Sequence, residues 1–297
     1  LLLMRFGFRK IEAIVVTLIL TILFIFGYLV VSSNPNLAAL FGGFLPQLQT
    51  VSTHGIHGAD SPLVMTLGII GATVMPHNLY LHSSISQTRQ VSRENKEELK
   101  EGVRFMAWDS NIQLSLAFVI NSFLLILGAS LFFGHGDQVG TFGQMYNALG
   151  DSSIAGAIAS PVLSTLFAVA LLASGQNSTI TGTLTGEVIM TGFLHLKVPM
   201  WLRRVITRGL ALIPVVAFTL IYGGDEGKLD QLLVYSQVFL SVALPFAMAP
   251  LIAFTSSKKV MGEDFANSKW MTWLAWIVFV VLTGLNIQLV FQILGQM

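Results

Sequence analysis

A short stretch around Pro76 holds the residues best suited to chemistry in this chain, within Gly71-Ala-Thr-Val-Met-Pro-His-Asn-Leu-Tyr-Leu-His-Ser83. Proline has no N–H to donate to the carbonyl four residues earlier, here that of Ala72. It also disfavours the helical conformation for the residue before it, Met75. The stretch lies within an apolar segment, so the spacing predicts a helix broken inside a membrane. A free carbonyl beside a thioether favours a transition-metal ion over Ca²⁺ or Mg²⁺, which prefer all-oxygen ligands.

Each of these side chains also has a purely structural interpretation. Met75 fills a core equally well, because methionine is an adaptable apolar residue. His77 and His82 are five residues apart, about 140° around a helix, so both cannot point at one ion without distortion. Proton relay or gating, metal ligation and structural hydrogen bonding remain open for each histidine, and relay suits a group that titrates near neutral pH.

Composition identifies an integral membrane protein. The mean hydropathy is +0.73, and charged residues make up 10% of the chain, against about 25% in soluble domains. There is no cysteine, so a metal site must use oxygen, nitrogen or thioether ligands. Sequence signatures of hydrolases, zinc proteases and phosphate-binding loops are absent, and we expect neither an enzyme nor a nucleic-acid partner.

Seven segments are long and apolar enough to span a bilayer as helices. They are residues 11–31, 62–87, 108–133, 160–190, 202–221, 230–254 and 270–296. Of the 16 basic residues, all but Lys228 fall on the loops of one side. Because basic residues concentrate on the cytoplasmic side, we expect the N-terminus of this chain in the cytoplasm and its C-terminus outside the cell membrane.

Other polar residues lie inside these spans. The Gln237 amide either coordinates a cation or makes a helix–helix hydrogen bond. Pro245 and Pro250 in the same span free the carbonyls of Ser241 and Phe246. The stretch rich in glycine and hydroxyl groups over residues 175–187 serves either close helix packing or a wet vestibule. Arg208 either snorkels to the interface or pairs with an acid or a relay histidine.

Three motifs carry a family resemblance. Ala72-Thr-Val-Met-Pro-His77, followed by Leu81-His82-Ser83, resembles the sixth transmembrane helix of the Nramp family of divalent metal transporters. Gly175-Gln-Asn-Ser-Thr-Ile-Thr-Gly-Thr183 resembles the end of that family's eighth helix. Ser236-Gln237-Val238, with Ala243-Leu-Pro-Phe246, resembles its tenth.

The resemblance implies an all-α membrane protein with the LeuT-type fold, in which two inverted repeats of five helices surround a midplane site. It implies proton-coupled uptake of Mn²⁺ and Fe²⁺, with Co²⁺ and Cd²⁺ as further substrates, and no cofactor. By matching position, the Ala72 carbonyl, Met75 and Gln237 would bind the ion. The proton route would include His77, His82 and the arginines Arg203, Arg204 and Arg208.

One motif of the family is missing. The Asp-Pro-Gly-Asn of its first helix, which supplies metal ligands, occurs nowhere in this chain. We therefore expect that the first four family helices are absent, and that this polypeptide does not transport without those helices as partners. The expected organisation is an end of a preceding helix, the last helix of the first repeat and an outer loop over 1–60, the second repeat over 61–256, and one further helix over 257–297.

Two alternatives remain. A transporter of the same fold could carry an organic solute such as an amino acid. The chain could also be a truncated membrane subunit that does not transport.

Overall fold

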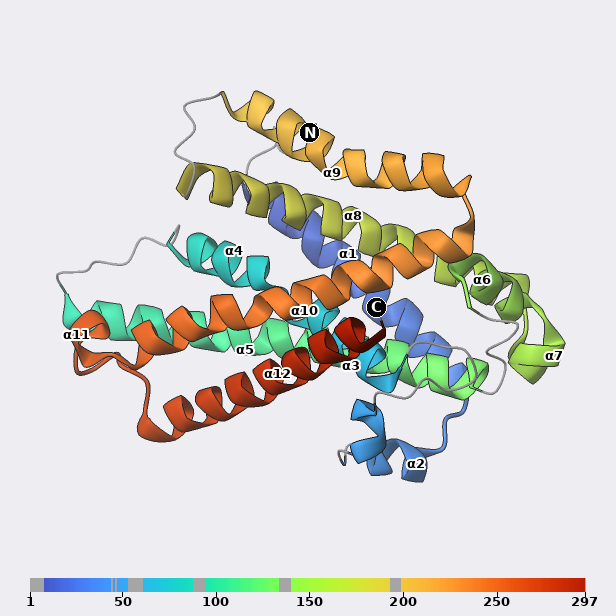
Figure 1. Ribbon diagram of the computed structural model, residues 1–297, viewed down its shortest axis with the longest axis horizontal. Coiled ribbons are helices and arrows are strands. Elements are labelled where there is room, and N and C mark those ends of the chain that lie inside the picture. The colour runs from blue at the N-terminus through green and yellow to red at the C-terminus, as the bar shows by residue number, and fades with distance from the viewer. Residues whose placement is uncertain are drawn as a thin grey trace. The chain divides into compact units, whose positions relative to one another are not determined.

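The computed structural model describes residues 8–43, 45, 47–52, 61–87, 95–133, 140–192 and 199–296. These residues form helices and connecting turns, and no strand occurs among them (Figure 1). The helices pack into two compact units, each formed from segments that are distant in the sequence. The units reflect packing rather than internal symmetry, so the repeat boundaries expected from the sequence stay a prediction.

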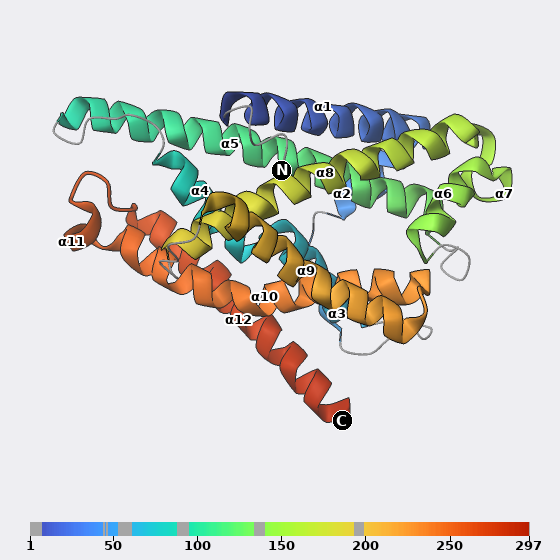
Figure 2. The ribbon, with the colours of Figure 1, turned by 90° about the horizontal axis from the view of Figure 1, so that it is seen from above.

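Unit 1 comprises residues 1–44 and 81–229. Its elements are α1 (Phe8–Ser32), α2 (Leu37–Gly42), the end of α4 (Pro76–Ser86), α5 (Lys96–Leu127), the π-helix η3 (Gly128–Phe132), α6 (Phe142–Gly150), α7 (Ser152–Ala155), the 3₁₀ turn η4 (Gly156–Ile158), α8 (Pro161–Gly192) and α9 (Met200–Tyr222). Helix α1 packs against both α5 and α8, and α9 lies along α8 (Figures 1 and 2). The core between α1 and α8 includes Phe26 and Phe167, whose rings meet edge to face.

Unit 2 comprises residues 45–80 and 230–297. Its elements are the 3₁₀ turn η2 (Leu48–Val51), α3 (Pro62–Thr73), the start of α4, nearly all of α10 (Glu226–Ser256), α11 (Lys258–Met261) and α12 (Lys269–Gln296). The core forms where α3, α10 and α12 meet. Leu63 and Leu67 of α3 pack there with Val238 of α10 and Leu289 of α12.

Among the residues that the structure describes, five helical stretches are long and apolar enough to cross a membrane: Ala13–Ser32, Pro62–Ser86, Lys96–Phe132, Gly227–Ser256 and Lys269–Gln292. The other two expected spans are also helical, as α8 and α9. Many large apolar side chains are exposed on these helices, among them Phe239 at 73% and Phe246 at 79%. Such surfaces suit contact with lipid, so the chain is a multi-pass, all-α membrane protein.

Candidate metal-ion site

The structure breaks the second span immediately before Pro76. Helix α3 ends at Thr73 and α4 begins at Pro76. Val74 still donates its N–H to the Ile70 carbonyl at 2.8 Å, but its φ of −108° and ψ of 78° are not helical, so α3 ends there. Among the described residues, the Ala72 carbonyl accepts none of the backbone hydrogen bonds that are made outside the helices. That oxygen therefore keeps its lone pairs for another partner.

A backbone contact between α3 and α10 lies next to this carbonyl. A Cβ added to Gly71 would lie 1.8 Å from the Gln237 carbonyl oxygen and 3.0 Å from the Ser241 nitrogen. Only glycine permits so close an approach, because any other side chain would push the helices apart. Gly71 was not among the site residues predicted from the sequence. The spacing of Gly68, Gly71 and Ala72, three small residues on an apolar helix, is the signal that would have found it.

The Gln237 side chain has an acceptor without a donor. Its Nε2 donates to the Ser236 hydroxyl at 3.1 Å. Its Oε1 is buried and, in the part of the chain that the structure describes, accepts no hydrogen bond. A buried amide oxygen with no partner costs free energy, so such an atom suggests a ligand or a water that completes it. An amide oxygen is also a suitable ligand for a divalent cation.

The three predicted donors thus belong to one unit: the Ala72 carbonyl, the half-buried Met75 thioether and the Gln237 amide. All three are neutral. No group of three or more His, Asp or Glu residues suited to a metal ion occurs among the residues that the structure describes. This donor set fits a soft divalent ion better than Ca²⁺, since it includes sulfur.

Asn286 on α12 fixes the α10 backbone one turn beyond Gln237. Its Nδ2 donates to the Ser241 carbonyl at 3.1 Å, and the Ser241 hydroxyl donates to the Asn286 Oδ1 at 3.3 Å. Both residues are buried. Asn286 was not among the residues predicted from the sequence, although a lone asparagine in an apolar span is a recognisable sign of a helix–helix hydrogen bond.

The residues predicted for a proton route lie in both units. His77, half-buried in the first turn of α4, shares unit 2 with the three donors, whereas His82, on the same helix, belongs to unit 1. Arg208 on α9 donates to the buried Thr183 hydroxyl of α8, with Nη2 at 3.1 Å and Nε at 3.4 Å. Arg203 and Arg204 lie on α9, and the structure describes only their backbone.

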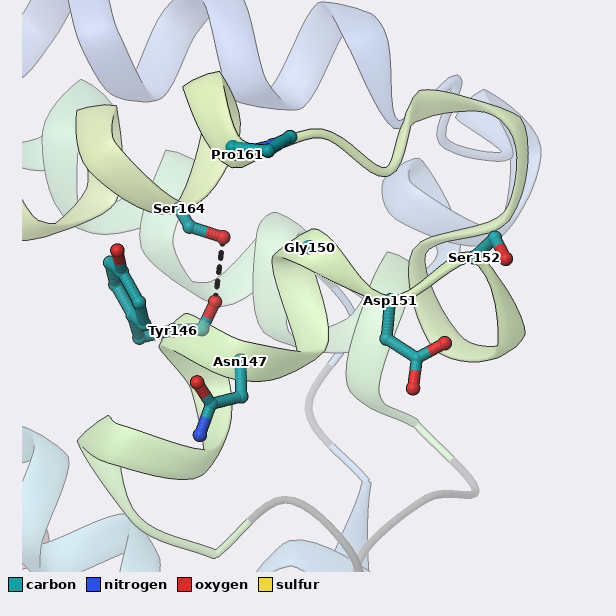
Figure 3. A pocket seen from close by; sticks show the side chains of 7 residues that line it. All are labelled: Tyr146, Asn147, Gly150, Asp151, Ser152, Pro161 and Ser164. Carbon is teal, nitrogen blue, oxygen red and sulfur yellow. Dashed lines mark hydrogen bonds between the residues drawn. The ribbon is translucent and has the colours of Figure 1, made fainter.

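A pocket of about 450 Å³ lies elsewhere, within unit 1 between α6, α7 and the start of α8. Its lining residues are Tyr146, Asn147, Gly150, Asp151, Ser152, Pro161 and Ser164 (Figure 3). The Ser164 hydroxyl donates to the Tyr146 carbonyl at 2.7 Å. The Asp151 carboxylate accepts from the Ser153 N–H, and hydrogen bonds from Ser153 lower the pKa of this carboxyl. None of the predicted site residues lines this pocket, and its side chains do not converge on one point.

The family assignment follows from comparison with known proteins. Residues 1–292 match the family described as Nramp, natural resistance-associated macrophage protein-like. The chain belongs to the Nramp family. It is 56% identical over 295 residues to a divalent metal cation transporter MntH of Pediococcus pentosaceus, and 53% identical over 293 residues to one of Staphylococcus aureus. These matches cover 99% and 98% of this chain, and each covers 64% of the relative.

A solved Nramp structure has the same fold. The manganese transporter of Eremococcus coleocola, in complex with an aromatic bis-isothiourea-substituted compound, matches with a TM-score of 0.86 at 49% identity. The match covers 99% of this chain and 62% of the transporter. The expected LeuT-type fold is therefore confirmed. So is the expectation that the chain is not an enzyme, because the Nramp family consists of metal-ion transporters.

Proposed function

We propose that the protein imports Mn²⁺ and Fe²⁺ across the cell membrane by alternating access, driven by proton entry. Co²⁺ and Cd²⁺ are further substrates, which bind at the same site with its thioether ligand. The proposal draws on relatives that are divalent metal cation transporters and on a neighbour of known structure that is a manganese transporter. It covers a whole protein, whereas this chain spans 64% of its Pediococcus pentosaceus relative.

The buried Oε1 of Gln237 is the observation that supports the proposal most directly. It accepts no hydrogen bond among the described residues, and it belongs to the residue whose backbone touches Gly71. Gly71 precedes Ala72, whose carbonyl Pro76 leaves without an intrahelical donor. The three donors are neutral, and a divalent ion in a membrane needs charge compensation, so the proposal requires an anionic ligand in addition.

The proposed proton route uses the ionisable groups of the broken helix and of α9. His77 and His82 pass protons along this route, since an imidazole ring has nitrogens that can bind and release a proton. Arg203, Arg204 and Arg208 act as fixed positive charges, because guanidinium does not deprotonate in proteins. Arg208 is held for such a role by its two contacts with Thr183.

The proposed orientation has the N-terminus of this chain in the cytoplasm and its C-terminus outside. Lys258, Lys259 and Lys269 then lie on the cytoplasmic side. Trp270 and Trp273, which follow Lys269, are 75% and 69% exposed. Exposed tryptophans beside basic residues are typical of a helix end at the membrane interface.

Uptake of Mn²⁺ into proteoliposomes that contain the full-length protein tests the function. We expect an inward proton gradient to accelerate uptake, and Gln237→Ala to raise the KM for Mn²⁺ about 10-fold or more. Gln231→Ala is the matched control, because Gln231 lies on the same helix and bonds only to the Tyr235 hydroxyl in the contacts described. Mn²⁺ uptake equal to that of empty liposomes, with uptake of an amino acid instead, would contradict the proposal.

A further inference from the structure

A hydrogen-bonded pair links the start of α3 to the end of α12. The Ser61 hydroxyl donates to Gln292 Oε1 at 3.1 Å, and Gln292 Nε2 lies 2.9 Å from the Ser61 Oγ. Ser61 is only 4% exposed. Its Oγ also accepts from the Val64 N–H at 3.4 Å and so caps α3. One buried hydroxyl thus caps one helix and joins it to another.

Helix α3 depends on such outside contacts. It has 12 residues, fewer than the roughly 20 that span a bilayer, so the helices that it packs against set its position. The break at Val74 and Met75 separates it from α4. Its apolar contacts come from Leu63 and Leu67, both 0% exposed, in the core shared with Leu289 of α12.

Helix α12 also forms a hydrogen bond to α10, the helix that carries Gln237, another of the proposed metal donors. Asn286 lies six residues before Gln292 and bonds to Ser241, one turn beyond Gln237 on α10. One helix therefore anchors both α3, which ends near the Ala72 carbonyl, and α10, which carries the Gln237 amide. A shift of α3 along α12 would move the Ala72 carbonyl relative to Gln237.

We propose that Ser61 and Gln292 are positioning residues for the metal site, which hold α3 on α12 so that the Ala72 carbonyl stays in register with Gln237. This inference rests on the proposed function, because it assigns the pair to the proposed metal donors. The pair acts through the helix backbone and touches no ion itself.

The first test compares Gln292→Ala with Gln288→Ala in Mn²⁺ uptake. Gln288 is the matched control, since it is exposed and makes only a 3.4 Å contact with the Val51 carbonyl among the contacts described. We expect Gln292→Ala to raise the KM for Mn²⁺ about 5-fold, the lower end of coupling between linked sites, with kcat unchanged. Ser61→Thr, which keeps the hydroxyl, should retain the original KM.

Two further results decide between positioning and mere stability. Ser61→Ala combined with Gln292→Ala should raise the KM no more than the larger single effect, because both changes remove one interaction. A lower unfolding temperature for Gln292→Ala with an unchanged KM would overturn the positioning role.

A cross-link provides an independent test, because the chain contains no cysteine. Before cross-linking, Ser61→Cys combined with Gln292→Cys should raise the KM for Mn²⁺ as the double alanine variant does. A short bis-methanethiosulfonate that joins the two positions should return the KM toward its original value. Loss of uptake on cross-linking, restored by reduction, would show that α3 must leave α12 and would overturn the inference. Failure of the unmodified protein to take up Mn²⁺ would instead contradict the proposed function.

Discussion

Asn286 donates its side-chain amide to the Ser241 carbonyl, the one that Pro245 leaves without an intrahelical donor. The contact is 3.1 Å long, and Ser241 is fully buried. Pro245 lies four residues after Ser241 and has no N–H. The asparagine on α12 therefore supplies the donor that α10 lacks, and α10 keeps its proline without an unsatisfied carbonyl in the core.

This relationship predicts non-additive effects on stability. Asn286→Ala should lower the free energy of unfolding by about 1–3 kcal/mol, because it leaves a buried carbonyl unsatisfied. Pro245→Ala restores an N–H for that carbonyl. In a Pro245→Ala background, Asn286→Ala should therefore lower the free energy of unfolding by a smaller amount. Denaturant unfolding in micelles measures all three variants. Additivity of the single effects within about 0.5 kcal/mol would show that the two residues do not share this carbonyl.

The contact at Gly71 predicts a sharp difference between two glycines on one helix. Gly71→Ala should lower the free energy of unfolding by about 1–3 kcal/mol, the usual cost of overpacking, and should impair Mn²⁺ uptake. Gly68→Ala is the control, because its Cβ would lie at an ordinary 3.6 Å from a Val238 methyl group. Unfolding in micelles and uptake assays measure both. Equal tolerance of both alanines would contradict a close α3–α10 contact.

Met75 should determine which ions the site admits. Without the thioether, the remaining donors are oxygens, which suit Ca²⁺ as well as Mn²⁺. Met75→Ala should therefore raise Ca²⁺ uptake, or competition by Ca²⁺, more than it lowers Mn²⁺ uptake. Met65→Ala on α3, a residue 42% exposed, should leave both unchanged. Ca²⁺ exclusion that persists in Met75→Ala would rule out the selectivity role.

The Arg208 contact predicts a specific requirement for the Thr183 hydroxyl. Thr183→Val keeps the shape but removes the acceptor of two guanidinium contacts, so we expect a loss of about 1–3 kcal/mol in unfolding free energy. Thr179→Val on the same helix is the control, because that hydroxyl is exposed and bonds only to the Gly175 carbonyl in the contacts described. Thermal unfolding in micelles compares the two. A Thr179 effect as large as that of Thr183 would contradict the prediction.

The features that could be predicted from the sequence depend on single residues or on short segments of the chain. The break before Pro76 depends on the missing N–H of a single residue, so it follows from the sequence without knowledge of the fold. The membrane-spanning helices follow from the length of apolar segments, and the span expected from residue 108 is the apolar part of α5, which begins at Lys96. Its first turn is capped by Asn95 and carries Glu97 and Glu98, which stabilise a helix start outside the apolar part.

Contacts between distant segments explain what the sequence could not predict. Gly71 meets Gln237, Asn286 meets Ser241, and Ser61 meets Gln292, across separations of up to 231 residues. Each depends on which faces of two helices pack together, and a periodic apolar pattern does not specify the partner. Gln237 could be proposed as a donor from its type, but its unpartnered oxygen became visible only with the surrounding helices in place.

The close approach at Gly71 also has a genetic consequence. Every single-base change of a glycine codon that replaces the amino acid introduces a residue with a Cβ. At position 71 that atom would lie 1.8 Å from a backbone oxygen that cannot rotate away. Every missense change one base away therefore meets the same obstacle, whatever the charge or polarity of the new side chain. We expect a saturation library of this gene to recover glycine alone at codon 71 under selection for metal uptake, and several small residues at codon 68.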